Sequence, residues 1–217
     1  RIIMASMLIA VIISDAFIPE IAKIFENRII VSKRLSSLFE FILLFSGLIL
    51  LTIFFYKKTI ILLLFSQEYL VLETSILLIL FIILLRYIGI VPGIILTSFG
   101  KQIIRAKAVV VSIISSVLLN FILIPIYGIN GAFLASLIAH IILNIIYVYY
   151  AHKTIFFTKN ISIFLLISIF SINYLFQLVF SSDSMISFGI TVILNALLTG
   201  VYFIIKSKKT LNFKNEV

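Results

Sequence analysis

The sequence contains no cysteine, and it has few charged residues for its length of 217. The absence of thiols excludes a disulfide framework, a zinc site built on thiolates and a cysteine nucleophile. Charged residues make up 12% of the chain, whereas 63% of the residues are hydrophobic; soluble domains have about 25% and 45–50%. One water-soluble core of this size cannot bury so many apolar side chains. The composition therefore excludes a soluble fold and places most side chains against lipid or other membrane helices.

Long continuous apolar runs cover most of the chain, without the alternation of apolar and polar residues that marks a membrane β-strand. A helix needs about 20 residues to cross the hydrocarbon core, so we predict an all-α, polytopic membrane helix bundle. The predicted spans are residues 1–19, 35–56, 74–97, 108–125, 131–150, 160–180 and 185–205. Because the first apolar run is cut by Arg1, we expect that further sequence precedes it.

Basic residues gather on alternate connecting segments. Segments 20–34, 100–107, 151–159 and 206–217 carry 13 Lys and Arg residues, whereas segments 57–73, 126–130 and 181–184 carry two. Cytoplasmic loops are rich in Lys and Arg, so the first group, including the C-terminus, is predicted to face the cytoplasm. The positive charge is spread over four short segments, so topology and anionic membrane lipid explain it, and nucleic acid is not an expected partner.

Two connecting segments also contain apolar residues. Segment 59–70 is too short and too interrupted to span the bilayer, which predicts an interfacial or partly re-entrant helix on the outer side. Segment 20–34 mixes apolar and charged residues at helical spacing, which predicts a helix lying along the inner surface.

Polar side chains inside the spans form stripes at helical spacing. The stripes are Ser112, Ser116 and Asn120; Ser136, His140, Asn144 and Tyr147; and Thr191, Asn195, Thr199 and Tyr202. They fit a bundle with wet inward faces, although hydrogen bonds between helices are the commoner explanation for any single Ser or Thr. The stripes make Asn120, His140, Asn144 and Asn195 candidates for the lining of a substrate cavity.

Three ionisable residues inside the spans are further candidates. Arg86 lies in the third predicted span, where a charge costs roughly 2.5 to 3.5 kcal/mol. It is therefore expected to face a cavity or an anion, or else to form a structural ion pair. Asp15 and Glu40 are candidates for coupling to protons or sodium, with pairing to the nearby basic residues of segment 20–34 as the alternative. For His140 we expect a neutral packed imidazole rather than a proton relay.

Motifs of common catalytic sites are missing from the sequence. There is no Gly-rich phosphate loop, His-Glu-x-x-His or Gly-x-Ser-x-Gly. His140 and His152 are not at zinc-ligand spacing, so no metal or other cofactor is expected. The longest outer segment, 57–73, is short and mostly apolar. These features favour a transporter over an enzyme, and a membrane polysaccharide polymerase stays as an alternative from another class.

Residues 120–138 read Asn-Phe-Ile-Leu-Ile-Pro-Ile-Tyr-Gly-Ile-Asn-Gly-Ala-Phe-Leu-Ala-Ser-Leu-Ile. This segment resembles a hairpin of the polysaccharide-transport branch of the multidrug/oligosaccharidyl-lipid/polysaccharide exporter superfamily. Pro125 is suited to close one span, Gly128 and Gly131 to form a tight turn, and Ala135 to let the returning helix approach closely. The segments at 17–22 and 64–69, and the Gly-Lys pair at 100–101, are weaker points of similarity.

The resemblance implies 12 to 14 helices in two lobes, of which this chain would be the C-terminal lobe without the N-terminal one. It also implies a flippase in the bacterial inner membrane that moves an undecaprenyl-pyrophosphate-linked oligosaccharide outward for O-antigen or other surface polysaccharide biosynthesis. A cation-coupled multidrug exporter of the same superfamily is the nearest alternative.

Overall fold

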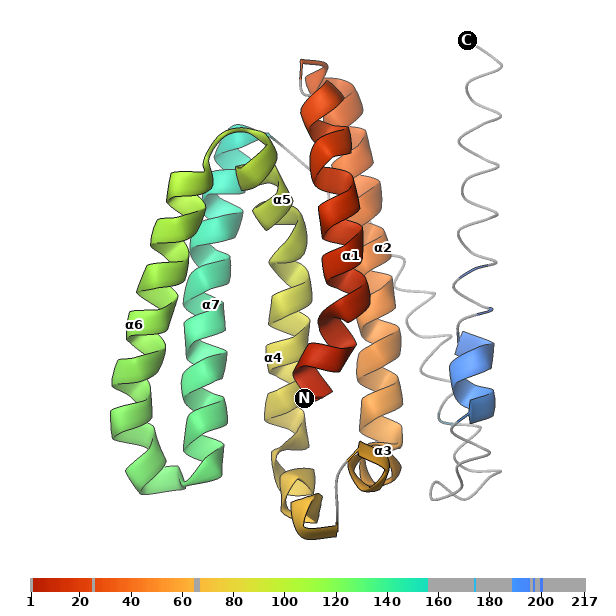
Figure 1. Cartoon of the computed structure of the whole chain (residues 1–217), viewed down its shortest axis with the longest axis vertical. Coiled ribbons are helices and arrows are strands. Elements are labelled where there is room, and N and C mark those ends of the chain that lie inside the picture. Colours follow the sequence, from red (N-terminus) through yellow and green to blue (C-terminus); the bar gives the residue numbers. More distant parts are fainter. Residues whose placement is uncertain are drawn as a thin grey trace.

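The computed structural model describes residues 2–24, 26–64, 67–155, 174, 189–195, 197 and 200. This part of the chain contains helices and no strand. The elements are α1 (Ile2–Ile24), α2 (Arg28–Phe55), α3 (Lys57–Leu64), the 3-10 helix η1 (Gln67–Ser75), α4 (Ile76–Ile88), α5 (Ile90–Ser98), α6 (Gln102–Tyr127) and α7 (Ile129–Thr154). Its long helices run side by side as a bundle (Figure 1).

Four helical segments are long and apolar enough to cross a membrane: Arg28–Phe55, Gln67–Ser98, Gln102–Tyr127 and Ile129–Thr154. They coincide with the second to fifth predicted spans, so the prediction of a multi-pass, all-α membrane bundle is confirmed at this level. The first predicted span is helical as α1 but is not among these four. The sixth span, 160–180, and most of the seventh lie outside the described residues, so the count of seven stays a prediction.

The prediction of a surface helix over 20–34 is wrong. α1 continues to Ile24, and α2 already begins at Arg28 after a short turn. The side chain of Asn27 caps α2 by accepting a hydrogen bond from the backbone N–H of Ile30, which satisfies one of the free donors at the helix start. Arg34 and Glu20 form an ion pair between the two helix ends. Local capping and this pair therefore extend the two long helices through the charged segment.

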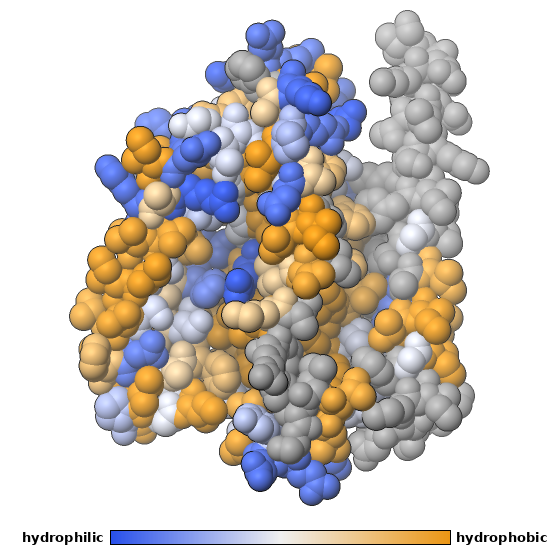
Figure 2. Space-filling model, viewed as in Figure 1, coloured by the Kyte–Doolittle hydropathy of each residue, from blue (hydrophilic) through white to orange (hydrophobic). Residues whose placement is uncertain are grey.

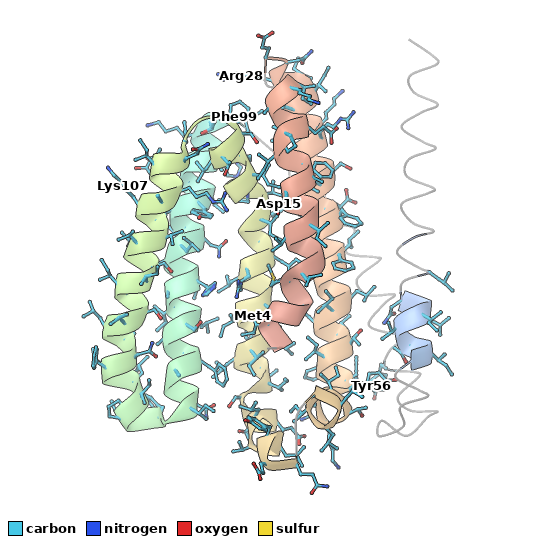
Figure 3. All side chains as sticks on the ribbon, in the orientation of Figure 1. Met4, Asp15, Arg28, Tyr56, Phe99 and Lys107 are labelled. Atoms are coloured by element: carbon cyan, nitrogen blue, oxygen red, sulfur yellow. The ribbon has the colours of Figure 1, made fainter. Side chains whose placement is uncertain are left out.

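The turns at the two ends of the bundle separate as the charge pattern predicts. The α1–α2 turn, the α5–α6 turn and the end of α7 lie at one end, and α3, η1 and the α6–α7 turn lie at the other (Figure 1). Arg28, Phe99 and Lys107 lie toward the first end and Tyr56 toward the second (Figure 3). Hydrophilic surface gathers near both ends with a hydrophobic band between them (Figure 2). The three basic segments that the structure describes, at least in part, therefore share one end. Segments 181–184 and 206–217 lie outside the described residues, and the compartment that each end faces stays a prediction.

The segment predicted as one interfacial helix over 59–70 is divided. α3 ends at Leu64, and η1 begins at Gln67. α3 is seen end-on in Figure 1, so it crosses the direction of the long helices. Lys57 and Glu73 form an ion pair of 2.8 Å, and the Ser75 hydroxyl donates to the side-chain oxygen of Asn130 over 2.5 Å.

The predicted span 74–97 is interrupted at Gly89, where α4 ends and α5 begins. Pro92 causes this interruption because it has no N–H to donate to the carbonyl of Ile88. α5 leans away from the axis of α4 (Figure 1). The side chains of Ile83, Tyr87 and Val91 along this segment are fully buried, and α4 and α5 contact α1, α2 and α7. The broken α4–α5 helix therefore forms the centre of the described bundle.

α6 and α7 form the closely packed hairpin that the small residues predict. Pro125 does not close the span as predicted, because α6 continues to Tyr127, and Gly131 lies inside α7 rather than in the turn. Gly128 turns the chain with a φ of 56°, a conformation that favours glycine. Ala135 and Ala139 of α7 are buried, and the Ser112 hydroxyl donates to the carbonyl of Ala139 over 2.9 Å. The remaining face of α6 exposes many large apolar residues, as expected for contact with lipid.

Candidate functional site

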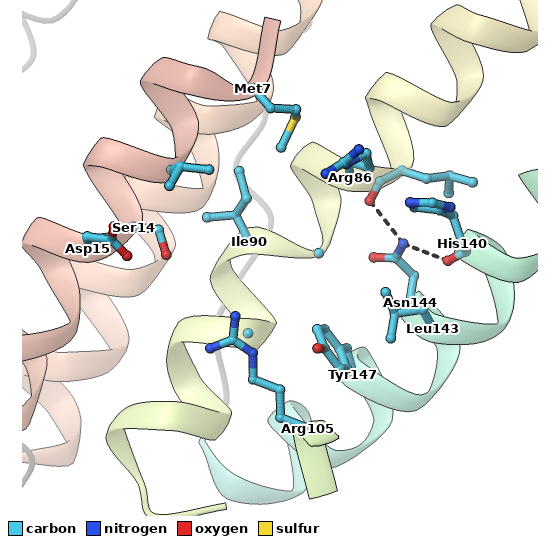
Figure 4. Close-up of a pocket in the computed structure, with 14 residues that line it drawn as sticks. Met7, Ser14, Asp15, Arg86, Ile90, Arg105, His140, Leu143, Asn144 and Tyr147 are labelled. Atoms are coloured by element: carbon cyan, nitrogen blue, oxygen red, sulfur yellow. Dashed lines mark hydrogen bonds between the residues drawn. The ribbon is translucent and has the colours of Figure 1, made fainter. Parts of the chain in front are cut away.

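A cavity of about 290 Å³ lies in the described bundle between α1, the α4–α5 break, the start of α6 and α7 (Figure 4). Its lining combines apolar side chains with several polar and charged ones. The lining residues are Met7, Val11, Ser14, Asp15, Leu85, Arg86, Gly89, Ile90, Gly93, Arg105, His140, Leu143, Asn144 and Tyr147. In Figure 2 hydrophilic surface is visible in a hollow within the hydrophobic band. Four predicted site residues, Asp15, Arg86, His140 and Asn144, thus come together from three helices.

Arg86 lies in the last turn of α4, where the partial negative charge of a helix C-terminus stabilises a cation. Its side chain is exposed along the cavity and forms neither an ion pair nor a hydrogen bond with any residue that the structure describes. The same holds for Asp15 on α1. The structural ion pair that we weighed for Arg86 is therefore absent from the described part of the chain.

Asn144 connects α7 to the end of α4. Its Nδ2 donates to the carbonyl oxygens of Leu85, over 2.9 Å, and His140, over 2.8 Å. Because both of these partners are acceptors, the amide atom that faces them must be the nitrogen. Oδ1 is then buried and has no hydrogen-bond partner among the described residues. It lies against Gly89, where an added Cβ would approach it to 3.0 Å. The glycine at the helix break therefore makes room for the amide.

His140 lies one helical turn before Asn144 on the same face of α7. Its Nδ1 is 2.8 Å from the carbonyl oxygen of Ser136, and because a carbonyl can only accept, Nδ1 carries the proton. In the neutral imidazole this leaves Nε2 as an acceptor. The ring lies beside Arg86 in Figure 4. This geometry fits the packed neutral imidazole that we predicted.

Arg105 also lines the cavity, and the sequence reasoning did not select it as a site residue. It lies in the first turn of α6, and its Nη1 donates to the hydroxyl of Thr97 over 2.6 Å. The missed signal is helical spacing: Arg105 precedes the buried Ala108 and Ser112 by three and seven residues and so shares their face. The sequence places this charge in segment 100–107, which is predicted to face the cytoplasm, and basic residues are common in such segments.

The other three predicted site residues lie elsewhere. Glu40 is buried in α2, 5% exposed. Asn120 of α6 has a buried Oδ1 without a hydrogen-bond partner in the described part of the chain. Asn195 is fully buried, and Thr191, one helical turn before it, forms a 2.7 Å hydrogen bond with the hydroxyl of Tyr56, the residue that follows α2. None of the three lines the cavity, so the structure does not bring them into one site with Arg86.

Comparison with known proteins finds no similar family, protein or structure. No protein-family model, curated protein or solved structure matches this chain. The similarity to an exporter superfamily therefore stays a prediction.

The chemistry of the cavity favours anions. Its lining includes two guanidinium groups and one carboxylate, and guanidinium groups bind phosphate oxygens through paired N–H donors. Among the described residues there is no group of three or more His, Asp or Glu side chains able to hold a metal ion. Apolar side chains such as Val11, Ile90 and Leu143 complete the walls. The cavity is therefore suited to an amphipathic ligand with a negatively charged group.

Proposed function

We propose that the protein is a flippase that moves a lipid-linked oligosaccharide from the inner to the outer leaflet of the bacterial inner membrane. The single observation that carries the proposal is the guanidinium of Arg86, unpaired among the described residues, in a cavity between apolar membrane helices. An unpaired charge at such a place is costly and is retained where it meets a ligand. An undecaprenyl-pyrophosphate carrier supplies the matching negative charge.

The size of the cavity limits what it holds. At about 290 Å³ it lies at the lower end of the range for small-molecule sites. It is suited to the phosphate-bearing part of the carrier rather than to a whole oligosaccharide. The sugar chain would then occupy space outside the described cavity. The residues that line the cavity therefore do not indicate which sugars it contains.

A cation-coupled multidrug exporter is the second candidate, and Asp15 favours it. This carboxylate lines the cavity without a partner in the described part of the chain and is the candidate for coupling to protons or sodium. Two guanidinium groups in the same cavity would repel a cationic drug. We therefore place Asp15 in a coupling role within the flippase proposal and expect an anionic substrate.

The test measures surface polysaccharide and membrane abundance in cells that depend on the protein for export. Arg86→Ala is expected to abolish export, and Arg86→Lys to retain part of it, because lysine keeps the charge but loses the paired donors. Arg28→Ala is the matched control, since Arg28 is an exposed arginine at the start of α2 outside the cavity.

All three variants are expected in the membrane at near-normal amounts. Normal export by Arg86→Ala would reject the proposal. Reduced abundance of Arg86→Ala, with export falling in proportion, would assign Arg86 a structural role instead.

A further inference from the structure

Arg105 reaches from the end of the bundle that carries the basic turns into the cavity. It follows the α5–α6 turn by a few residues, and its guanidinium points toward α5 (Figure 4). The hydroxyl of Thr97 accepts a hydrogen bond from Nη1 over 2.6 Å and donates to the carbonyl of Gly93 over 2.9 Å. Thr97 therefore orients the guanidinium while using only one of its five N–H donors.

Apart from Thr97, the part of α5 nearest to Nε of Arg105 is a glycine. Gly93 lies under it, and an added Cβ there would be 4.0 Å from Nε of Arg105 and 3.6 Å from Cε2 of Tyr147. The absence of a side chain leaves a floor next to Nε, with the ring of Tyr147 as a wall. A phosphate oxygen placed on that floor would meet the N–H donors that Thr97 does not use.

The two guanidinium groups of the cavity lie at different depths. Arg86 and Gly93 are seven residues apart along α4–α5, a backbone rise of at most about 10 Å because the helix is broken at Gly89, and Nε of Arg105 lies 4.0 Å from the position of a Cβ on Gly93. Arg105 is therefore nearer to the end with the basic turns, which is predicted to be cytoplasmic. A ligand entering from that side would reach Arg105 before Arg86.

We infer that Arg105 is a second phosphate-binding residue, which receives the diphosphate of an isoprenoid-linked substrate at the cytoplasmic mouth of the cavity. Thr97 is its positioning residue, and Gly93 provides the floor. Arg105 and Arg86 together form two successive stations for the same negatively charged group. The inference rests on the proposed function for the direction of entry and for the lipid attached to the diphosphate.

The test titrates the purified protein in lipid nanodiscs with radiolabelled farnesyl diphosphate, a soluble isoprenoid diphosphate. Arg105→Ala is expected to weaken binding by about tenfold or more, because it removes a charge-assisted contact. Lys107→Ala is the matched control: Lys107 is an exposed cation of the same helical turn, outside the cavity and directed away from it (Figure 3). Its binding is expected to stay within about twofold of the parent.

Further variants separate binding from folding. Arg105→Lys keeps a charge and is expected to retain part of the binding, while Thr97→Val weakens binding and Thr97→Ser restores it because serine keeps the hydroxyl. Unchanged binding in Arg105→Ala, or an equal loss in Lys107→Ala, would overturn the inference. A uniform loss in both Thr97 variants would reject the positioning role.

Competition identifies the part of the ligand that is recognised. Farnesol should not displace farnesyl diphosphate, and inorganic diphosphate should displace it only at higher concentration. Displacement by farnesol would show an apolar site without anion recognition, and equally strong displacement by inorganic diphosphate would overturn the assignment to a lipid head group.

Export distinguishes this inference from the proposed function. Lost binding in Arg105→Ala, together with normal polysaccharide export by Arg86→Ala, would support the anion site and reject the flippase. Normal binding in Arg105→Ala, together with export abolished by Arg86→Ala, would reject the inference and keep the proposed function.

Discussion

Replacing Gly131 by alanine tests the packing of the α6–α7 hairpin. A Cβ on Gly131 would lie 2.1 Å from the carbonyl oxygen of Leu123, 2.5 Å from its carbonyl carbon and 2.9 Å from the backbone nitrogen of Ile124. These atoms belong to the backbone of α6, so they cannot rotate away as the end of a side chain could. The two helices must separate at this level, which loosens the contacts along Ala135 and Ala139.

The expected cost combines two opposing contributions. Forcing extra atoms into a packed contact costs about 1–3 kcal/mol, and the backbone clash places Gly131→Ala near the upper value. Alanine returns about 1 kcal/mol through its better helix propensity. The net loss of unfolding free energy is therefore about 2 kcal/mol, and Gly131→Leu is expected to lose more.

Gly200 is the matched control because no atom of the described residues lies within 4 Å of an added Cβ there. Each variant is fused to a fluorescent protein and heated in detergent, and the monodisperse fraction is measured by size-exclusion chromatography. Gly131→Ala is expected to lower the midpoint by about 4–8 °C, whereas Gly200→Ala leaves it unchanged or raises it slightly. Equal midpoints for the two alanine variants would refute the close-packing argument.

Two further predictions concern the helix break and the topology. Gly89→Ala is expected to displace the Asn144 amide, because its Cβ would approach Oδ1 to 3.0 Å. In a protein that already carries Asn144→Ala, the same change should lower the unfolding free energy by less. A double-mutant cycle in the same thermal assay should therefore give at least about 0.5 kcal/mol of coupling. Additive midpoint changes would contradict the direct contact. For topology, the chain has no native cysteine, so single cysteines at the exposed Glu26 and Tyr127 report without background: an impermeant thiol reagent should label Tyr127→Cys in intact cells and Glu26→Cys only after permeabilisation. The reverse labelling would invert the predicted orientation.

The length of the apolar runs predicted where the long helices lie. It did not predict their ends, which depend on local hydrogen bonds and ion pairs. The apolar runs at 35–56 and 108–125 correspond to α2 and α6, yet α2 begins seven residues earlier, at Arg28. The Asn27 cap and the ion pair of Arg34 with Glu20 stabilise helix where hydropathy predicts a surface segment. The ends of a helix are set by its backbone hydrogen bonds, whereas hydropathy indicates only the part of the helix that contacts lipid or the protein core.

Polar groups are costly in lipid, and this cost pointed to four residues that line the cavity: Asp15, Arg86, His140 and Asn144. It did not predict which of the polar residues lie close together. Asn120 and Asn144 have the same side chain and comparable apolar surroundings in sequence, yet only Asn144 faces the α4–α5 break. In a membrane both lipid-facing and protein-facing surfaces are apolar, so periodicity alone does not assign facing helices. Arg105 was missed because the charge asymmetry of the loops already explained it.

The walls of the cavity differ in how firmly they are held, and this difference bears on how a ligand would act. α7 is tied to α4 by the Asn144 amide, and α1 is tied to α4 and α5 by hydrogen bonds from Tyr87 to the carbonyl of Ser6 and from Ser98 to that of Ile18. α6, by contrast, packs mainly on α7 and reaches α5 through the Arg105 side chain. A diphosphate passing from Arg105 to Arg86 would therefore move from the α6 wall, which packs mainly on α7, to α4, which contacts α1, α2 and α7.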